Sequence, residues 1–413
     1  MRVAHIITRL IIGGAQENTL FNCEDLCALY GDDVLLIAGP PEGPEGSLMR
    51  RAADATYRFE PVPELCRSVL PWNDWTAYRK IRRLLRDFQP DVVHTHSAKA
   101  GILGRLAARS LGVPAIVHGI HGTPFYSGQP AIQRRLIRMA ERFAAGRCDA
   151  FIAVADAMRS TFVQEGIVRA DELAHKPIVT IRSGMDVEPF LRCNEHRAAV
   201  RARYGFRDTD IVVGKIARLF RLKGHDELIT SAATLAERLR DVSLNANALN
   251  GNLRDRNTPA PTVRFLLVGD GILHDSLRAQ IKSLGIGEMF TFAGLVPPEE
   301  IPAMISAMDI VVHTSLREGL ARVLPQALIA GRPVVSYDID GAREVCITGE
   351  TGELITPHDT VGIADAIERL ARDPDLRCRY GEAGRRRFTS PFRHEQMTAE
   401  IRNVYEQILQ RRR

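Results

Sequence analysis

The chain has 413 residues, of which 45% are hydrophobic and 25% are charged, and its formal net charge is +5. This length exceeds one ordinary compact core and suits two domains. The composition is that of a soluble globular protein, no apolar run approaches the roughly 20 residues that span a bilayer, and the mild charge excess does not indicate a nucleic-acid-binding protein. The seven cysteines are scattered and complete no zinc site, so we expect a reduced, cytoplasmic protein without a structural metal.

Short apolar runs rich in β-branched residues alternate with longer helical patterns along the chain. The alternation predicts parallel strands joined by helices, in sheets covered on both faces. The first run begins at the N-terminus and is too broken for a signal peptide. The expected strands span residues 3–8, 34–38, 91–94, 115–118, 150–154, 178–181, 211–217, 263–268, 290–293, 310–313, 334–337 and 353–355. The series restarts near residue 211, which predicts an α/β protein with two doubly wound, Rossmann-like domains.

We place the boundary between the domains after residue 190, so that residues 1–190 form the first domain and residues 191–392 the second. A C-terminal helix over residues 393–413 is expected to join the first domain. Residues 245–261 are rich in Asn, end in Pro259 and Pro261, and lack periodicity. They predict a flexible insertion between a helix and the strand at residue 263.

Two basic segments of the first domain, residues 79–86 and 134–138, have helical patterns. Two interpretations stay open for them. Each segment is either a solvated helix face or part of a surface that meets anionic lipid headgroups. Apolar residues interleave with the cations, as an interfacial helix requires; they are Leu84, Leu85, Leu136 and Ile137. The second interpretation predicts peripheral contact with the inner face of the cell membrane.

Paired glycines, Gly13 and Gly14, follow the first strand and precede a helix that contains Gln16. Glycines at this place let a ligand approach the backbone, and a helix N-terminus favours an anion. The alternative is a tight turn without a ligand. The dinucleotide fingerprint Gly-x-Gly-x-x-Gly is absent, which disfavours a Rossmann dehydrogenase.

Histidines gather at strand ends in the first half. His94 and His96 alternate onto one face of a strand, and a metal site is conceivable there, but no nearby Cys or carboxylate completes it. We therefore favour two polar histidines beside a ligand. His121 lies in a Gly-rich loop after the next strand, a location that favours a polar contact or a base over a purely structural histidine.

In the second half, Arg218 follows a strand directly and Lys223 comes five residues later. Ligands of open α/β sheets bind at these strand ends, where two cations can hold a diphosphate and stabilise its charge as it leaves. The alternative is two solvated cations. The next strand ends in the turn Gly269-Asp270-Gly271, which is either part of the ligand site or an ordinary turn.

The strand at residue 310 leads to Glu318-Gly319-Leu320-Ala321-Arg322 and then to a helix. Backbone amides at residues 320–322 would face a phosphate, and Glu318 would accept hydrogen bonds from sugar hydroxyls. For Glu318 alone, helix capping is the alternative. Gln326 is expected two turns along the helix.

Together these motifs resemble those of the GT-B-fold, retaining family 4 glycosyltransferases, above all the enzymes that build capsules and exopolysaccharides. The resemblance covers nearly the whole chain in order. It is carried by Gly13 to Gln16, His94 to Gly101, His121 to Phe125, Arg218 with Lys223 and Gly224, Gly269 to Gly271, and Glu318 with Gly319.

The resemblance implies two Rossmann-like domains that face each other across a cleft. It implies a UDP- or GDP-sugar donor held mainly by the second domain, a sugar or lipid-linked sugar acceptor held mainly by the first, and no cofactor or essential metal. Arg218 and Lys223 would neutralise the leaving diphosphate while the sugar keeps its anomeric configuration. His121 would lie near the transferred sugar, Glu318 would contact its hydroxyls, and Gln326 would hold the ribose.

Two positions depart from the family pattern. Gln326 stands where the family has a second Glu, and Ala321 stands where it has a second Gly. An amide still hydrogen-bonds ribose hydroxyls, but without charge. Two alternatives therefore stay beside the transferase: a UDP-sugar 2-epimerase of the same architecture, and a non-catalytic protein that binds nucleotide-sugars.

Overall fold

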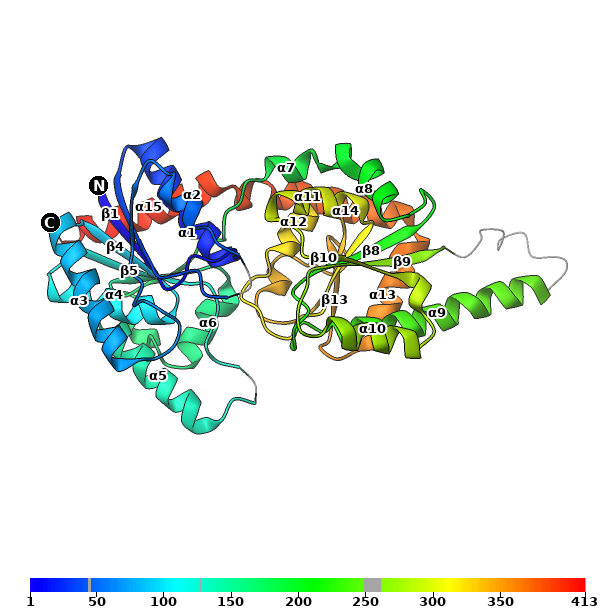
Figure 1. Ribbon diagram of the computed structural model, residues 1–413, viewed down its shortest axis with the longest axis horizontal. Helices are drawn as coiled ribbons and strands as arrows, with labels where there is room; N and C mark the ends of the chain where they lie inside the picture. The colour runs from blue at the N-terminus through cyan, green and yellow to red at the C-terminus, as the bar shows by residue number, and fades with distance from the viewer. Residues whose placement is uncertain (44–45, 127, 249–260, 413) are drawn as a thin grey trace. The chain divides into compact units, whose positions relative to one another are not determined.

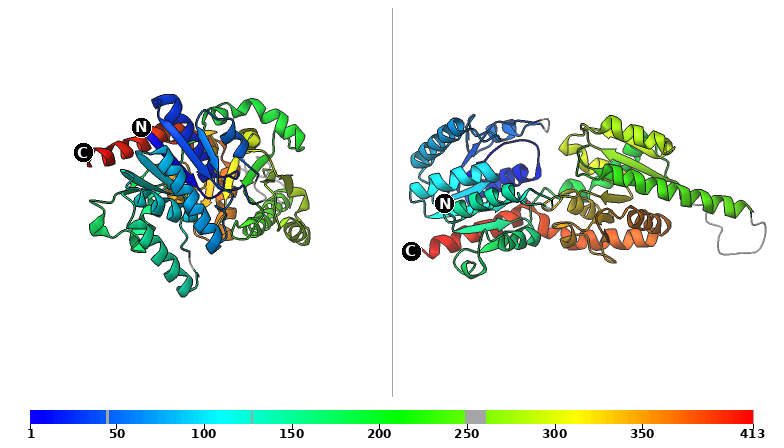
Figure 2. Two further views of the ribbon diagram at one scale, coloured as in Figure 1. Left: turned by 60° about the vertical axis from the view of Figure 1, so that its left-hand side comes forward. Right: turned by 90° about the horizontal axis from the view of Figure 1, so that it is seen from below.

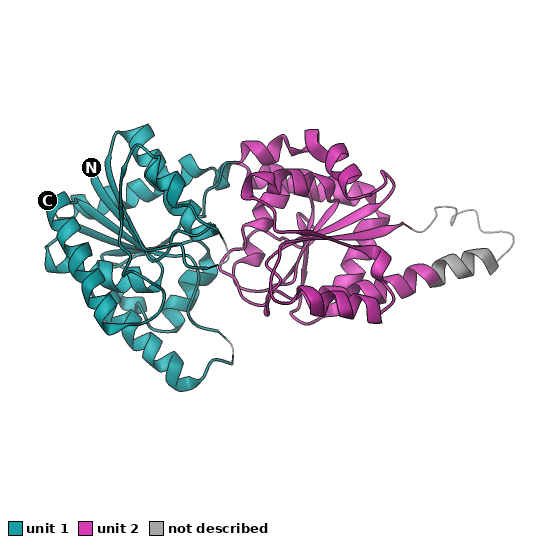
Figure 3. Ribbon diagram, in the orientation of Figure 1, with its two compact units in different colours: residues 1–186, 390–413 teal, residues 187–389 magenta. Residues whose placement is uncertain are grey.

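The computed structural model describes residues 1–43, 46–126, 128–248 and 261–412. It divides into two compact units: Met1–Asp186 with Ser390–Arg413, and Val187–Thr389 (Figures 1 and 3). The division falls four residues before the boundary expected from the sequence, because the short helix α7 (Glu188–Leu191) packs on helices of the second unit. In each unit, helices cover both faces of a parallel sheet.

The first sheet has seven parallel strands in the order β3-β2-β1-β4-β5-β6-β7. They are β1 (Arg2–Ile7), β2 (Asp33–Ala38), β3 (Arg58–Pro61), β4 (Val92–His96), β5 (Ala115–Ile120), β6 (Ala150–Ala153) and β7 (Ile178–Thr180). Strand β3 was not predicted. It lies at the sheet edge, where charged residues such as Arg58 and Glu60 and a final Pro61 are tolerated, because one side of an edge strand needs no partner.

Two apolar clusters fill the two faces of this sheet. One contains Leu20 of α1 and Ile401 of α15, and the other contains Ile81 of α3 and Ala107 of α4. The helices of the first unit are α1 (Gly14–Tyr30), α2 (Met49–Ala53), α3 (Pro71–Phe88), α4 (Ala98–Ser110), α5 (Ala131–Ala145), α6 (Asp156–Gln164) and α15 (His394–Gln410).

The C-terminal helix α15 packs against α1 within the first unit, as Figures 1 and 2 show. Its buried residues recur every three or four positions, which gives one apolar face toward the sheet. A buried carboxylate also anchors it: Asp25 of α1 accepts hydrogen bonds from His394 at 2.8 Å and from Thr398 at 2.9 Å.

The second sheet has six parallel strands in the order β10-β9-β8-β11-β12-β13. They are β8 (Ile211–Ile216), β9 (Val263–Val268), β10 (Phe290–Gly294), β11 (Ile310–His313), β12 (Val334–Tyr337) and β13 (Gly352–Ile355). Besides α7, the longer helices are α8 (Arg197–Arg203), α9 (His225–Ala248), α10 (His274–Ser283), α11 (Ile301–Ala307), α12 (Val323–Ile329), α13 (Thr360–Arg372) and α14 (Pro374–Phe388).

The predicted insertion over residues 245–261 begins inside α9, which extends to Ala248. Its residues 249–260 lie outside the described residues. Within the part of the chain that is described, no helix has both the length and the apolar character needed to cross a membrane.

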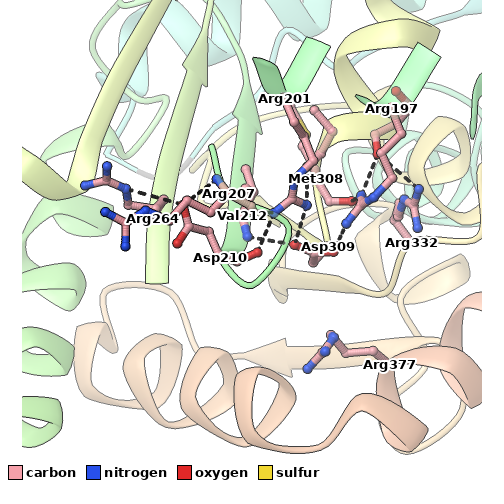
Figure 4. Close-up of polar contacts among 12 residues, drawn as sticks. Arg197, Arg201, Arg207, Asp210, Val212, Arg264, Met308, Asp309, Arg332 and Arg377 are labelled. Atoms are coloured by element: carbon pink, nitrogen blue, oxygen red, sulfur yellow. Dashed lines mark hydrogen bonds and ion pairs between the residues drawn. The ribbon is translucent and has the colours of Figure 1, made fainter. Parts of the chain in front are cut away.

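The amino edge of the second sheet is held by an arginine network around Asp309, which directly precedes β11 (Figure 4). Its carboxylate accepts hydrogen bonds from Arg197 at 2.5 Å, from Arg201 at 3.3 Å and from the backbone amide of Val212 at 2.8 Å. Both arginines also donate to backbone carbonyls at the end of α11. Because their charges meet a carboxylate and a helix C-terminus, this network fixes α8 and α11 to the sheet.

Candidate active site

In the first unit, histidines from two adjacent strands meet on one face of the sheet. The register pairs His5 of β1 with His94 of β4, and His96 of β4 with Gly119 of β5. His5 is fully buried, and His94 and His96 are each 1% exposed. The structure therefore joins the predicted pair His94 and His96 to His5, which sequence analysis did not single out.

Hydrogen bonds connect these rings to one another and to the next loop. His5 Nδ1 lies 3.0 Å from His96 Nε2, and His96 Nδ1 lies 2.9 Å from Nε2 of half-buried His121. His94 Nδ1 lies 2.6 Å from the Tyr405 hydroxyl of α15. A histidine inside an otherwise apolar first strand was the available sequence signal for His5. No local signal existed for Tyr405, because it is 311 positions from His94.

Burial keeps these imidazoles neutral. It lowers the pKa of His5 to about 3 and the pKa of His121 to about 4. It also lowers the pKa of His94 and of His96 well below the usual value, and the neighbouring histidines add to this effect. The rings fill the space beside Gly119, where an added Cβ would lie 2.9 Å from His96 Nδ1 and 3.0 Å from His121 Nε2.

The sequence offered only His94 and His96 for a metal site, and His5 adds a third imidazole beside them. One ring nitrogen from each of His5, His94 and His96 lies within 4.8 Å of the others. The donor set fits a metal ion poorly, however. His5 and His96 share a hydrogen bond, His96 uses its other nitrogen on His121, and the described members of the group include no carboxylate that would balance the charge of a metal ion. A buried divalent ion would keep its charge uncompensated.

The predicted glycine turn of the first unit does open a helix. Helix α1 begins at Gly14, with Gly13 as its N-cap, and the backbone amide of Glu17 donates to the Gly13 carbonyl at 3.0 Å. Gln16 lies in the first turn of α1 and is half-buried. Ligand contact by Gly13, Gly14 or Gln16 stays a prediction.

In the second unit, the predicted Lys223 and Glu318 form an ion pair at the carboxyl edge of the sheet. Their side chains are 20% and 25% exposed, so solvent and ligands still reach them. The backbone amide of Glu318 donates to Asp340 at 2.8 Å, which holds this loop. Arg218 is exposed on the loop after β8, with its guanidinium carbon 5.1 Å from the centre of the Phe220 ring.

Buried polar groups that sequence analysis did not single out lie behind this pair. Lys215 of β8 is fully buried and donates to Thr314 at 2.6 Å. Burial lowers the pKa of Lys215 to about 7, and the charge of Lys223 adds to this. Burial also lowers the pKa of His313, whose Nε2 lies 3.9 Å from Glu318. A lysine within an apolar strand was the sequence signal for Lys215.

Glycines let the loops of this edge approach one another. At Gly224, where φ is +60°, an added Cβ would lie 2.0 Å from the Thr314 carbonyl oxygen. At Gly269, where φ is +133°, it would lie 2.2 Å from the Ala217 carbonyl oxygen. The carbonyl of Asp270 accepts from the Leu219 amide at 2.9 Å, so the predicted Gly269–Gly271 turn supports the loop that carries Arg218. Its own ligand contact stays a prediction.

The helix that contains Gln326 begins later than the sequence pattern indicated. Helix α12 begins at Val323, so Gln326 lies in its first turn and the expected position two turns along the helix was wrong. The pattern misplaced the helix start because residues 319–322 are irregular in the structure. Gln326 is half-buried, and the Gly341 amide donates to the Gly319 carbonyl at 3.0 Å. No geometry here tests the ligand contacts expected of Leu320, Ala321 and Arg322.

Comparison with known proteins assigns the chain to a family. Residues 196–387 match the glycosyl transferases group 1, and residues 13–177 match the glycosyl transferase 4-like domain. The chain is 30% identical over 312 residues to the alpha-D-kanosaminyltransferase of Streptomyces kanamyceticus, with 74% of each chain covered. It is 26% identical over 377 residues to an Escherichia coli enzyme, UDP-Gal:alpha-D-GlcNAc-diphosphoundecaprenol alpha-1,3-galactosyltransferase, with 91% of this chain and 89% of that one covered.

Solved structures agree in fold. HepE of Anabaena in complex with UDP matches with a TM-score of 0.77 at 20% identity, covering 98% of this chain and 100% of that chain. The two parallel sheets and the sequence matches to both units lead to one conclusion: the chain belongs to the family 4 glycosyltransferases of the GT-B fold.

Proposed function

We propose that this glycosyltransferase moves a sugar from a nucleotide-sugar to a sugar or lipid-linked sugar acceptor, with retention of configuration and without a metal ion. The observation that carries the proposal is the Lys223–Glu318 ion pair at the carboxyl edge of the second sheet, where Lys223 stands on the same loop as Arg218. A diphosphate that enters such an edge meets the cations of the loop after β8.

We assign a role in the reaction to both members of the ion pair. When a diphosphate arrives, Lys223 exchanges Glu318 for phosphate oxygens and stabilises the charge that grows on the leaving group. Glu318, released from Lys223, accepts hydrogen bonds from hydroxyls of the transferred sugar. An anion bound nearby would favour the protonated form of the buried Lys215, whose pKa is about 7.

Relatives suggest which substrates to try first. HepE was solved with UDP and with UDP-glucose, and the name of the Escherichia coli relative gives a UDP-Gal donor and a diphosphoundecaprenol-linked acceptor. We therefore propose a UDP-sugar before a GDP-sugar. For this chain we propose an acceptor on a lipid carrier, as in the synthesis of cell-surface polysaccharide or glycolipid.

Turnover with defined substrates tests the proposal. The protein is incubated with UDP-, GDP- and ADP-sugars in EDTA, with and without a lipid-linked acceptor, and the anomer of the product is read by NMR. We expect a retained anomer and nucleotide release that depends on the acceptor. Equal release of UDP without acceptor would favour a UDP-sugar 2-epimerase, and binding without turnover would favour a non-catalytic protein.

Peripheral membrane contact is part of the proposal, with α5 as the contacting helix. Leu85 is buried in the core and Leu84 packs against it, so the interfacial role expected for these two leucines was wrong. Helix α5 instead exposes an apolar row between its arginines: Ile132 is 77% exposed, Leu136 61%, Met139 59% and Phe143 53%. We propose that this face of α5 inserts between anionic lipid headgroups, with its arginines at the phosphates.

Vesicle flotation tests the membrane contact. We expect binding to anionic vesicles at low salt that falls as salt rises, because salt screens the attraction. Changing Leu136 and Phe143 together to Ser should abolish flotation. Leu29→Ser on α1, where the leucine is 54% exposed, is the matched control and should leave flotation unchanged. A wild-type protein that stays free at low salt would show α5 to be an ordinary solvated helix.

A further inference from the structure

Three imidazoles of the first unit form one hydrogen-bonded chain. It runs from His5 of β1 through His96 of β4 to His121 in the loop after β5, with distances of 3.0 Å and 2.9 Å between the bonded nitrogens. Both ends of the chain, His5 Nε2 and His121 Nδ1, are buried nitrogens without a hydrogen-bond partner among the described residues. Every inner nitrogen of this row of imidazoles therefore has a hydrogen-bond partner, and its two terminal nitrogens have none among the described residues.

Hydrogen counting limits the states of this chain. A neutral imidazole carries one N–H, so three neutral rings carry three hydrogens. Each of the two hydrogen bonds contains one of them, whichever ring donates. The third hydrogen must then lie at an end of the chain, either on His121 Nδ1 or on His5 Nε2. Because the middle ring uses both nitrogens, the tautomers of all three rings change together.

The surroundings of the two ends differ. His5 is fully buried within β1, and a hydrogen on its Nε2 would be a donor that no acceptor reaches. A bare nitrogen lone pair is tolerated better there than a buried N–H. His121 is half-buried in a loop at the carboxyl ends of the strands, so its buried Nδ1 is the end of the hydrogen-bonded row that lies nearer to where ligands of such sheets bind. The third hydrogen therefore belongs on His121 Nδ1.

We infer that His5 and His96 are positioning residues that hold His121 as its Nδ1–H tautomer, so that His121 offers a neutral hydrogen-bond donor to a sugar oxygen of the substrate. The contact between His121 and a sugar oxygen rests on the proposed glycosyl transfer. The tautomer of His121 does not depend on that proposal. A neutral donor is suited to a hydroxyl or ring oxygen, because it needs no ionisation at the pH where the enzyme works.

Other polar groups near these three imidazoles have hydrogen-bond partners outside the row, although His94 Nε2 and one Arg105 nitrogen are buried without a partner. His118 is bonded to Thr95 at 2.9 Å, His94 to Tyr405 at 2.6 Å, and Arg105 to Glu141 at 3.2 Å and to the Gly101 carbonyl. Each of these pairs belongs to a different strand or helix contact. Variants at such positions therefore disturb the same core without breaking the chain, which provides matched controls.

The test is the tautomer of His121 in the full-length protein labelled with ¹⁵N-histidine, read by NMR at neutral pH without substrate. The signal is assigned by its loss in His121→Gln. In the wild type we expect hydrogen on Nδ1 and a bare Nε2. In His5→Phe, which removes the first donor, we expect a mixture of tautomers. His5→Asn should restore the wild-type pattern, since its amide takes the place of Nδ1. Tyr405→Phe, the control, should leave the pattern unchanged.

Kinetics then connect the tautomer to catalysis. We expect His5→Phe to lower kcat roughly tenfold with an unchanged KM for the donor, and His5→Asn to recover most of the loss. A wild-type His121 with its hydrogen on Nε2, or an unchanged tautomer in His5→Phe, would overturn the inference. A shifted tautomer with unchanged kcat would overturn its catalytic part. If the protein shows no transferase activity, the NMR result on the His121 tautomer still stands. Failure of the proposed function and failure of the tautomer inference are therefore distinguishable.

A metal centre is the competing outcome. A Co²⁺ titration of the wild-type protein, followed by visible absorption, is expected to show no stoichiometric site in the first unit. One equivalent of bound Co²⁺ with visible d–d bands that disappear in His94→Ala would overturn the hydrogen-bonded chain in favour of a His5, His94 and His96 metal site.

Discussion

The carboxyl edges of the two sheets are built alike and charged differently. In the first unit, polar groups on the central strands are neutral imidazoles such as His5 and His96, and burial keeps their pKa low. In the second unit, the equivalent place holds Lys215, Lys223 and Glu318, with an ion pair open to solvent. One edge is thus suited to hydrogen bonds with uncharged hydroxyls and the other to an anion. The same topology thus presents two different polar surfaces through a few side chains.

Acid should act more strongly on the first unit than on the second, because among the described residues five histidines with a lowered pKa lie in the first unit and two, His225 and His313, lie in the second. His5 has a pKa of about 3 in the folded chain and about 6.5 in an unfolded one, so the unfolded state binds more protons between these values. Stability is therefore present above pH 6.5 and is lost as pH falls, by about 2 kcal/mol at pH 5 for each such histidine. Hydrogen exchange at pH 7 and pH 5, read by mass spectrometry, should show β1, β4 and β5 opening first. Equal protection at both pH values would contradict this.

Removing a cation from the second edge should cost activity and leave the first edge intact. Lys223→Ala is expected to lower turnover by roughly a hundredfold, the scale of a lost charge-stabilising donor. Arg221→Ala, an exposed cation on the same loop, is the control and should stay within a few-fold of the wild type. A steady-state assay decides. Wild-type activity in Lys223→Ala would remove Lys223 from the diphosphate site.

Alkali should raise the stability of the second unit. The pKa of Lys215 is about 7 in the folded protein and about 10.4 in an unfolded chain, so the unfolded state again binds more protons in this window. Stability of the second unit should rise with pH, by about 2 kcal/mol from pH 7.5 to 9. Lys215→Met should remove this rise in urea unfolding curves. A variant with the same slope as the wild type would show that Lys215 is not the responsible group.

The amide in the first turn of α12 should have a smaller effect. If Gln326 holds the ribose through hydrogen bonds alone, Gln326→Ala should weaken donor binding by about 1–3 kcal/mol, the cost of an unpaired buried polar partner. Gln326→Glu should keep the function. Calorimetry with the donor measures both variants, and unchanged affinity in Gln326→Ala would place this residue outside the site.

The regular parts of the fold followed from local pattern. Strands such as β8 and β11 are continuous apolar runs that a covered parallel sheet requires, and their positions were predicted closely. Strand β3 was not, because an edge strand with Arg58 and Glu60 lacks that signal. The start of α12 was misplaced because an irregular segment precedes it.

The candidate site was predictable only where its residues follow strand ends. Lys223 and Glu318 stand in such loops, and the structure brings them together. The chain of His5, His96 and His121 depends instead on the register between β1, β4 and β5, which a single sequence does not specify. The contact between His94 and Tyr405 depends on the return of α15 to the first unit.

Ligand binding in EDTA tests the central claim most directly, namely that the cations of the second unit hold a nucleoside diphosphate without a metal. UDP, GDP and ADP are titrated calorimetrically into the wild type and Lys223→Ala, with the corresponding nucleosides as controls. We expect one diphosphate to bind at least tenfold more tightly than its nucleoside, and Lys223→Ala to remove most of this difference. Diphosphates that bind no better than nucleosides, or only when a divalent metal is added, would contradict it.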